Sequence, residues 1–376
     1  MRSRWQQCSS AINWTDPASG IPYQNDVLVR IDSVVIIIEA KSGRMHPSAR
    51  RGAPLRLEKV IKDLVVDPAI QSRRLEAFLR TQQDTVSFSG ADGGKRDFDM
   101  RGVETVVSWS ITLDDVADLS AVQTELVASG WVPSDVVLPP SMSLSDLQNL
   151  FELLDGYCPK IHYLCRRAHW VRSARYMGDE LDLLAVYFNT FFEIGEAESD
   201  GTRLMAYGAS EIFNRYLLEL EQGRRPRKPK LPLTRWWFNV LAFLEERLPA
   251  RWSQIGLDLL SVPESDQERF AELMRGVRRN VLQRAEPLQD TTVFISGSRR
   301  KVAIVGVAYM DRTREERNDR LIKAASQAMF ADGSRPDRVV VIGCDPRIHG
   351  IPFSVVALVG FNSEVSAILE VQGESS

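Results

Sequence analysis

Residues 34–38 form the stretch that most constrains what this chain can fold into. They are five consecutive β-branched apolar residues, Val-Val-Ile-Ile-Ile. A run this short and this β-branched is typical of a strand that is buried on both faces. The run continues directly into Glu39, Ala40 and Lys41. Because side chains alternate across a strand, we expect Glu39 and Lys41 to project from the same face, roughly 7 Å apart.

Charged residues gather where this strand is expected to end, and burying them costs free energy unless each has a partner or a metal. Residues 26–31 form a shorter apolar segment that begins with Asp26. A tight connection at residues 30–33 would return the chain as a hairpin and place Asp26 beside Glu39. Two carboxylates and a lysine then form a site for a hard cation such as Mg²⁺, which prefers oxygen ligands and retained waters. The alternative is a surface hairpin in which Glu39 and Lys41 form only an ion pair.

Asp26 followed by Glu39, Ala40 and Lys41 resembles the D…(D/E)xK signature of the PD-(D/E)xK nuclease superfamily. The similarity is nearest to its nuclease-related (NERD) and Mrr-like restriction members, and it covers the first third of the chain. The resemblance implies a restriction-endonuclease-like core and Mg²⁺- or Mn²⁺-dependent hydrolysis of DNA phosphodiester bonds in restriction, repair or defence. It also implies that Asp26 and Glu39 bind the metal with the backbone carbonyl of Ala40, while Lys41 positions or activates the attacking water.

A glutamine follows this signature on an apolar helical stripe. The spacing predicts a helix over residues 55–66, and Asp67 and Pro68 supply an N-cap and a first-turn proline for a second helix that ends near Arg80. On that second helix Gln71 shares its stripe with three apolar residues. These are Leu75, Phe78 and Leu79. Some members of the superfamily carry a glutamine on the helix after ExK, so the resemblance implies Gln71 as an auxiliary catalytic residue. The alternative is a glutamine at the boundary between core and solvent.

The loop after Lys41 is rich in glycine, proline and arginine. Guanidinium groups bind phosphate through paired hydrogen bonds, so Arg44, Arg50 and Arg51 are candidate contacts to nucleic acid beside the metal. The alternative is a solvated loop.

The start of the chain departs from the family pattern. The superfamily core is expected to follow the order α-β-β-β-α-β, with a first helix that often carries an acidic residue. Residues 1–25 are polar and rich in turn residues, and residues 1–13 contain no acid. Either the first helix is abbreviated or this start lies downstream of the true one, and Asp16 is a poor candidate for a further metal ligand.

Changes in residue pattern divide the chain into three expected domains. Strand character returns over residues 84–113 and a helix is expected over 119–129, so a nuclease-like domain would cover residues 1–135. Helical periodicity predicts a helical domain over residues 143–285. Residues 290–365 predict a β-β-α-β-β unit. The expected fold class is therefore α/β or α+β: a restriction-endonuclease-like core, a helical region and a small C-terminal α/β unit.

Two cysteines and two histidines recur in the expected helical domain, at spacings of four, three and four. They are Cys158, His162, Cys165 and His169. The residue types suggest zinc, but the spacings put them along one stripe of a single helix, about 16 Å long. One ion cannot take tetrahedral ligands from so long a stripe. A helix face packed in the core is the better interpretation, and two of these residues with ligands from elsewhere is the alternative.

Residues 223–235 form a basic segment that holds three prolines and no acid. Its cations are Arg224, Arg225, Arg227, Lys228, Lys230 and Arg235. This composition predicts an extended linker. Clustered cations bind phosphate without sequence preference, so a DNA-backbone arm is one interpretation and a solvated linker is the other. Further along, Asp311, Asp345 and His349 could form a second site, but their spacing is not specific.

Composition limits which partners the protein can bind more than it limits which reaction it can catalyse. The 376 residues carry a net charge of −3, so DNA contact must come from local basic patches. Four scattered cysteines fit a reducing cytoplasm. An apolar signal region and an apolar run of about 18 residues are both missing, so we expect no membrane segment. A glycine-rich phosphate loop ending in Gly-Lys-Ser/Thr is also missing, which excludes a P-loop ATPase motor.

The expected partner is DNA, together with a second copy of the chain or a partner protein contacted through the helical region. Two other functions stay open. A catalytically silent relative would bind DNA or protein with the nuclease fold, and a scaffold protein would use Glu39 and Lys41 only as an ion pair.

Overall fold

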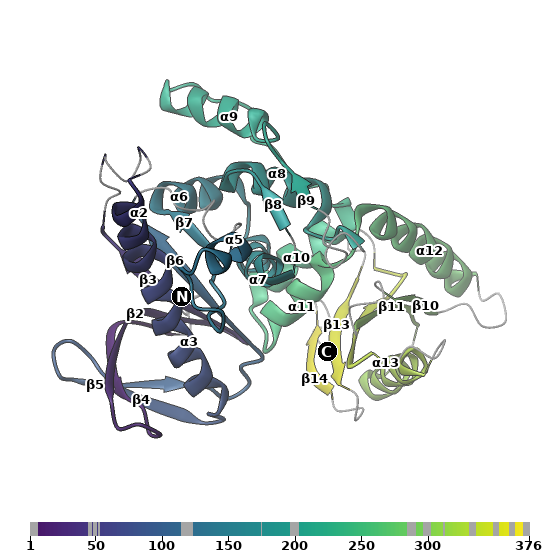
Figure 1. The fold of residues 1–376 in the computed structure, drawn as a ribbon. Coiled ribbons are helices and arrows are strands. Elements are labelled where there is room, and N and C mark those ends of the chain that lie inside the picture. The colour runs from purple at the N-terminus through teal and green to yellow at the C-terminus, as the bar shows by residue number, and fades with distance from the viewer. Residues whose placement is uncertain are drawn as a thin grey trace. The chain divides into compact units, whose positions relative to one another are not determined.

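The chain forms two compact units, Met1–Leu231 and Pro232–Ser376. The computed structural model (Figure 1) describes residues 7–43, 47, 51, 53–113, 123–173, 175–195, 203–283, 291–295, 302–310, 313–330, 336–348, 353–360 and 365–370. The boundary between the units falls inside residues 143–285, for which the sequence predicts one helical domain, and the three expected ranges stay predictions. Among the described helices, none combines the length and the apolar character that a membrane crossing requires.

A seven-stranded mixed sheet forms the centre of the first unit (Figure 1), in the order β5-β4-β1-β2-β3-β6-β7. Strands β1, β2 and β3 form an antiparallel meander, while β6 pairs in parallel with β3 and β7 with β6. The β4–β5 hairpin extends the other edge. The bounds are β1 (Gln7–Thr15), β2 (Pro22–Ile31), β3 (Val34–Lys41), β4 (Thr85–Ser89), β5 (Lys95–Asp99), β6 (Thr105–Thr112) and β7 (Ser141–Ser143).

The hairpin expected between the two apolar segments is confirmed. β2 and β3 pair in antiparallel register up to Ile31 and Val34, and Asp32 and Ser33 form the connecting turn. Asp32 has a φ of 53°, in the left-handed region that aspartate enters more readily than most residues. Strand β1 is not predicted by the sequence. Most of its side chains are polar, and only Ile12 and Trp14 are buried.

The helical segment after β3 differs from the two separate helices expected. α2 (Pro54–Ile61) continues through a π-helical turn, η1 (Lys62–Val66), into α3 (Asp67–Arg80). Asp67 is not an N-cap, because its backbone is α-helical and its N–H donates to the carbonyl of Lys62. Pro68 has no N–H to donate to the carbonyl of Leu64. That carbonyl instead accepts a hydrogen bond from the Ser110 hydroxyl on β6, at 3.4 Å. The Asp-Pro pair therefore marks a change of helix type, not a helix start.

Helices cover both faces of this sheet. On one face, Leu75 and Leu79 of α3 pack into a core cluster with strand residues that include Leu28. On the other face lie α6 (Leu144–Leu153) and α7 (Cys158–Ser173). The indole N–H of Trp109 on β6 donates to the carbonyl of Leu164 on α7, at 3.2 Å. The sheet is therefore buried on both sides, as the β-branched run in β3 predicts.

Short elements complete the first unit: α5 (Gln123–Ala128), β8 (Arg175–Met177), α8 (Glu180–Thr190), β9 (Arg203–Met205) and α9 (Glu211–Glu221). α6 and α8 agree with the helical periodicity expected after residue 143. α6 begins with a capping box formed by Ser143 and Asp146, and the carboxylate of Asp179 caps α8.

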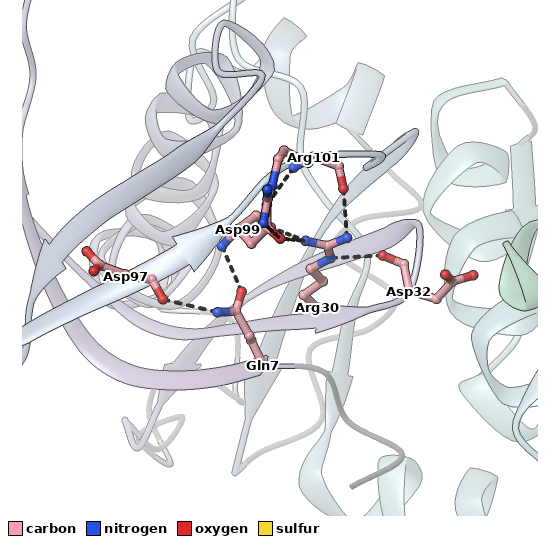
Figure 2. Close-up of polar contacts among 6 residues, drawn as sticks. All are labelled: Gln7, Arg30, Asp32, Asp97, Asp99 and Arg101. Carbon is pink, nitrogen blue, oxygen red and sulfur yellow. Dashed lines mark hydrogen bonds and ion pairs between the residues drawn. The ribbon is translucent and has the colours of Figure 1, made fainter. Parts of the chain in front are cut away.

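A polar network, here called the Arg30 cluster, ties the β4–β5 hairpin to β1 and β2 (Figure 2). Its members are Gln7, Arg30, Asp32, Asp97, Asp99 and Arg101. The guanidinium of Arg30 donates to the carbonyls of Asp32, Asp99 and Arg101. The Gln7 amide donates to the carbonyl of Asp97 at 3.1 Å and accepts from the N–H of Asp99 at 2.8 Å. Through these bonds a buried arginine stabilises an otherwise thinly attached sheet edge.

The second unit contains a five-stranded sheet in the order β10-β11-β12-β13-β14. Among its described strands only β11 and β12 pair in parallel, and α13 connects them and packs on one face. The expected β-β-α-β-β pattern is confirmed, but β14 is not predicted. The bounds are α10 (Arg235–Arg247), α11 (Trp252–Leu260), α12 (Glu264–Leu282), β10 (Thr291–Ile295), β11 (Val302–Ala308), α13 (Arg314–Met329), β12 (Arg338–Cys344), β13 (Val355–Gly360) and β14 (Val365–Glu370). The predicted α/β class is thus confirmed for the chain.

Candidate active site

The carboxylates expected at the end of β3 meet where its pairing with β2 stops. The last paired residues are Val27 and Ile38. One step further, the backbone N–H of Ala40 donates to Asp26 Oδ2 at 2.8 Å. A side chain thus replaces a strand carbonyl as the acceptor, which fixes the carboxylate of Asp26 beside the ExK residues.

The ammonium group of Lys41 lies near both carboxylates. Its Nζ is 3.9 Å from Asp26 Oδ2 and 3.8 Å from Glu39 Oε2. It also donates to Gln71 Oε1 at 3.0 Å. Gln71 belongs to α3, so a strand end and a helix converge on one amine. The structure therefore brings together Asp26, Glu39, Ala40, Lys41 and Gln71.

Glu39 is the most buried carboxylate of this group, with 1% of its surface exposed. Burial away from water disfavours the ionised form and raises the pKa of Glu39 from 4.5 to about 7. The hydrogen bond from Asn25 and the positive charge of Lys41 lower this pKa, while the negative charge of Asp26 raises it. The site therefore holds a carboxyl group that changes protonation near neutral pH.

Asn25 is a further member that sequence analysis misses. Its Nδ2 donates to Glu39 Oε1 at 2.5 Å and to the backbone carbonyl of Gln71 at 3.3 Å. The indole N–H of Trp14 donates to Asn25 Oδ1 at 2.8 Å, which fixes the orientation of the amide. Asn25, Asp26, Glu39, Lys41 and Gln71 are called the Glu39 cluster below.

A reversal of strand alternation explains how Asn25 and Asp26, which are consecutive, both reach this cluster. Leu28 and Tyr23 both pack on the α3 face, although an odd separation would put them on opposite faces of a regular strand. The reversal falls at Asp26. Its neighbour in β1 is Ala11, whose φ of 49° is left-handed. Regular alternation, the only signal available from sequence, points Asn25 away from the site.

The donor chemistry of the cluster fits a hard cation. Asp26 and Glu39 offer carboxylate oxygens and Ala40 a backbone carbonyl, and Mg²⁺ typically takes one or two carboxylates and keeps several waters. Asp26 and Lys41 are partly exposed, with 35% and 23% of their side-chain surfaces open to solvent. Within the described ranges, no three His, Cys, Asp or Glu side chains gather closely enough to hold a metal. A third acidic or nitrogen ligand is therefore not found among these residues.

The arginines expected beside the metal are only partly covered by the structure. Arg51 is exposed, and its backbone N–H donates a hydrogen bond to the carbonyl of Pro47. Arg44 and Arg50 lie outside the described residues. The phosphate-binding role of all three stays a prediction.

The Cys/His stripe is part of α7, as expected, and its first half packs in the core. Cys158 and His162 are buried, and His162 Nδ1 lies 3.0 Å from the hydroxyl of Tyr187. Cys165 is half-buried and His169 exposed. The core interpretation therefore holds for Cys158 and His162, whereas the stripe reaches the surface at His169.

The basic segment runs as irregular chain from Arg224 to Thr234, as predicted for a linker. One of its cations, Lys228, pairs with Asp155 at 2.6 Å. In the proposed C-terminal site, Asp345 forms an ion pair with Arg347, while Asp311 and His349 lie outside the described residues.

The structure thus places a buried acid, a second acid, a lysine and two amides at one strand end. In comparisons with known proteins, no family model, no curated protein and no solved structure matches this chain.

Proposed function

We propose that this protein is a metal-dependent nuclease that hydrolyses DNA phosphodiester bonds at the Glu39 cluster. The observation that carries the proposal is the placement of buried Glu39 beside Asp26 and Lys41 at the end of a central strand. A buried carboxyl with a pKa of about 7 destabilises the fold when ionised, and a divalent cation offsets that charge. Perturbed carboxyl groups of this kind concentrate at functional sites.

In this proposal the carboxylates of Asp26 and Glu39 hold the metal, and the carbonyl of Ala40 completes the protein ligands. A bound Mg²⁺ would polarise a phosphate oxygen and lower the pKa of a water. Asn25 supports Glu39 from the side away from Lys41, because its amide donates to Oε1 while Lys41 approaches Oε2. Asn25 therefore acts as a positioning residue that is itself oriented by Trp14.

Lys41 would contact the scissile phosphate or the attacking water. Gln71 accepts one hydrogen bond from its ammonium group, which leaves two N–H donors for the ligands of the site. A fixed ammonium aimed at developing negative charge lowers the barrier to the chemical step. Gln71 thereby orients Lys41, which gives the glutamine on α3 an auxiliary role.

The order of elements supports the resemblance to PD-(D/E)xK nucleases. β1, β2 and β3 form a meander, α3 packs on its face, and β6 returns in parallel beside β3. Apart from the β4–β5 hairpin, which lies between α3 and β6 in the chain, this order agrees with the β-β-β-α-β part expected for that superfamily. The acid, ExK and glutamine positions lie where β2, β3 and α3 meet.

Metal-dependent cleavage is the direct test. We would incubate the protein with supercoiled, linear and single-stranded DNA in Mg²⁺, Mn²⁺ or EDTA. Lys41→Ala would be compared with Lys62→Ala, which removes an exposed lysine from η1. We expect metal-dependent cleavage that Lys62→Ala retains and that Lys41→Ala reduces at least about 100-fold. Absence of cleavage in every condition, or full activity of Lys41→Ala, would contradict the proposal.

A catalytically silent binding protein is the second candidate. The observation that favours it is that members of the Glu39 cluster already contact one another: Lys41 pairs with both carboxylates and Gln71, and Asp26 accepts from Ala40. Divalent-ion binding separates the two candidates. A nuclease should bind Mg²⁺ and lose it in Asp26→Asn, whereas a silent relative would bind DNA with or without the ion.

A further inference from the structure

A cavity of about 330 Å³ lies on the face of the sheet opposite the Glu39 cluster. Strands β2, β3 and β6 form its floor, and α6, α7 and the connection between them supply the other walls. Ile36 and Ile38 of β3 line it, and they alternate with Ile37 and Glu39, which face α3. Ten of its lining side chains are apolar, and the other two are Tyr157 and Lys160.

The floor of the cavity is buried and apolar, and its opening combines apolar and polar side chains. The floor residues Ile36 and Trp109 are almost completely buried. At the mouth, Leu147 and Tyr157 are half-buried, and Phe151 exposes 40% of its surface. A concave apolar space with a few polar groups at one end is how small-molecule sites are generally built.

Among the described residues, Lys160 supplies the one cation that lines this space. Its Nζ lies 5.6 Å from the centroid of the Phe151 ring, and within the portion of the chain that the structure describes it forms no ion pair. Two acids nearby in sequence have other partners. Glu152 accepts from the hydroxyl of Tyr216, and Asp155 pairs with Lys228. The ammonium of Lys160 is therefore available to an anionic ligand at the mouth.

We propose that this cavity binds a small single-chain amphiphile with an acidic end, of the fatty-acid class. The chain would fill the apolar space between the sheet and α7, and the carboxylate would pair with Lys160. An apolar cavity of about 150 Å³ accommodates benzene, so one of 330 Å³ suits a ligand of about a dozen non-hydrogen atoms. That size excludes two-chain lipids. The site is independent of the proposed nuclease function, because it uses the opposite face of β3.

Isothermal titration with decanoate tests the site, with 1-decanol as the uncharged probe and decyltrimethylammonium as the cationic one. Lys160→Gln removes the cation, and Lys62→Gln is the matched control at an exposed lysine away from the cavity. Leu147→Trp narrows the mouth. We expect decanoate to bind, Lys160→Gln to weaken it about fivefold and to leave decanol within about twofold, and Lys62→Gln to change neither. We expect Leu147→Trp to weaken both ligands at least about tenfold.

Failure of decanoate to bind below its micelle concentration would overturn the proposal. Equal binding of the cationic probe, or an unchanged decanoate affinity in Lys160→Gln, would overturn it as well. Thermal unfolding verifies that each variant is folded. If Leu147→Trp does not fold, the decanoate affinities of wild type and Lys160→Gln test the proposal by themselves. Decanoate binding and DNA cleavage are measured independently, so loss of one can be distinguished from loss of the other.

Discussion

The β2–β3 hairpin carries a polar cluster toward each end, and the two clusters handle charge in opposite ways. In the Arg30 cluster the cation is buried, with three backbone carbonyls and the Asp99 carboxylate around it. The Arg101 hydrogen bonds hold the pKa of Asp99 well below its usual range. In the Glu39 cluster the anion is buried, and the nearest cation among the described residues, Lys41, lies 3.8 Å away. Burial there raises the pKa of the carboxyl to about 7.

This difference separates a structural cluster from a candidate active site. Around Arg30 the buried guanidinium is compensated by three carbonyls and the Asp99 carboxylate, so these contacts contribute stability without any ligand. Around Glu39 the compensation is incomplete, so ionisation destabilises the fold and a cation from solution would stabilise it. Strained electrostatics of this kind is common where a protein binds and reacts.

The largest effect should come from Arg30→Ala. The substitution leaves the carbonyls of Asp32, Asp99 and Arg101 without their donor and removes a buried cation. We expect the free energy of unfolding to fall by about 4 kcal/mol, with or without Mg²⁺. Urea denaturation measures it, and Arg96→Ala, which breaks an exposed pair with Asp92, should cost less than about 1 kcal/mol. Equal losses in the two variants would refute the structural role of Arg30.

Glu39→Gln should raise the free energy of unfolding, in contrast to Arg30→Ala. Between pH 4.5 and about 7 folded Glu39 is protonated while unfolded Glu39 is not, so wild-type stability falls as pH rises through that window and then levels off. Without divalent ions, we expect the variant to be more stable than wild type by up to about 3 kcal/mol near pH 8, converging below pH 4.5. Denaturation across pH measures the difference. A variant less stable than wild type at pH 8 would show that the carboxylate is fully compensated.

The smallest effect concerns Mg²⁺ affinity. Because the ion and a proton compete for Glu39, affinity should fall by up to about tenfold per pH unit below about pH 7. Calorimetric titration at several pH values measures this slope, and Asp26→Asn provides the control that should bind weakly throughout. An affinity that stays constant from pH 8 to pH 5.5 would mean that Glu39 is not a ligand.

Much of the candidate site follows from two simple signals in the sequence. The β-branched run predicts β3, and its alternation puts Glu39 and Lys41 on one face. The turn at Asp32 and Ser33 then brings Asp26 back beside them. The position of Gln71 follows from helical spacing. That spacing puts Gln71 on the same helix face as Leu75 and Leu79, and this face of α3 packs against the sheet.

The remainder needs tertiary information. Asn25 is hidden because alternation reverses at Asp26, where Ala11 adopts a left-handed backbone. Strand β1 is hidden because its side chains are mostly polar, and its place is fixed by backbone pairing with β2. The helix break expected at Asp67 does not occur, since the Ser110 hydroxyl on a distant strand accommodates the carbonyl that Pro68 leaves open.

The π-helical turn η1 has a consequence for how this protein can change. A π turn holds one more residue than the α-helical turn it replaces, and each residue advances a helix by about 100°. The turn therefore absorbs one extra residue while the rotational phase between α2 and α3 is kept. Loss of a single residue between Lys62 and Val66 would convert the π turn into an α-helical turn and leave Gln71 facing Lys41. Loss of a single residue from the regular turn of α3 before Gln71 would instead rotate Gln71 by about 100° away from Lys41.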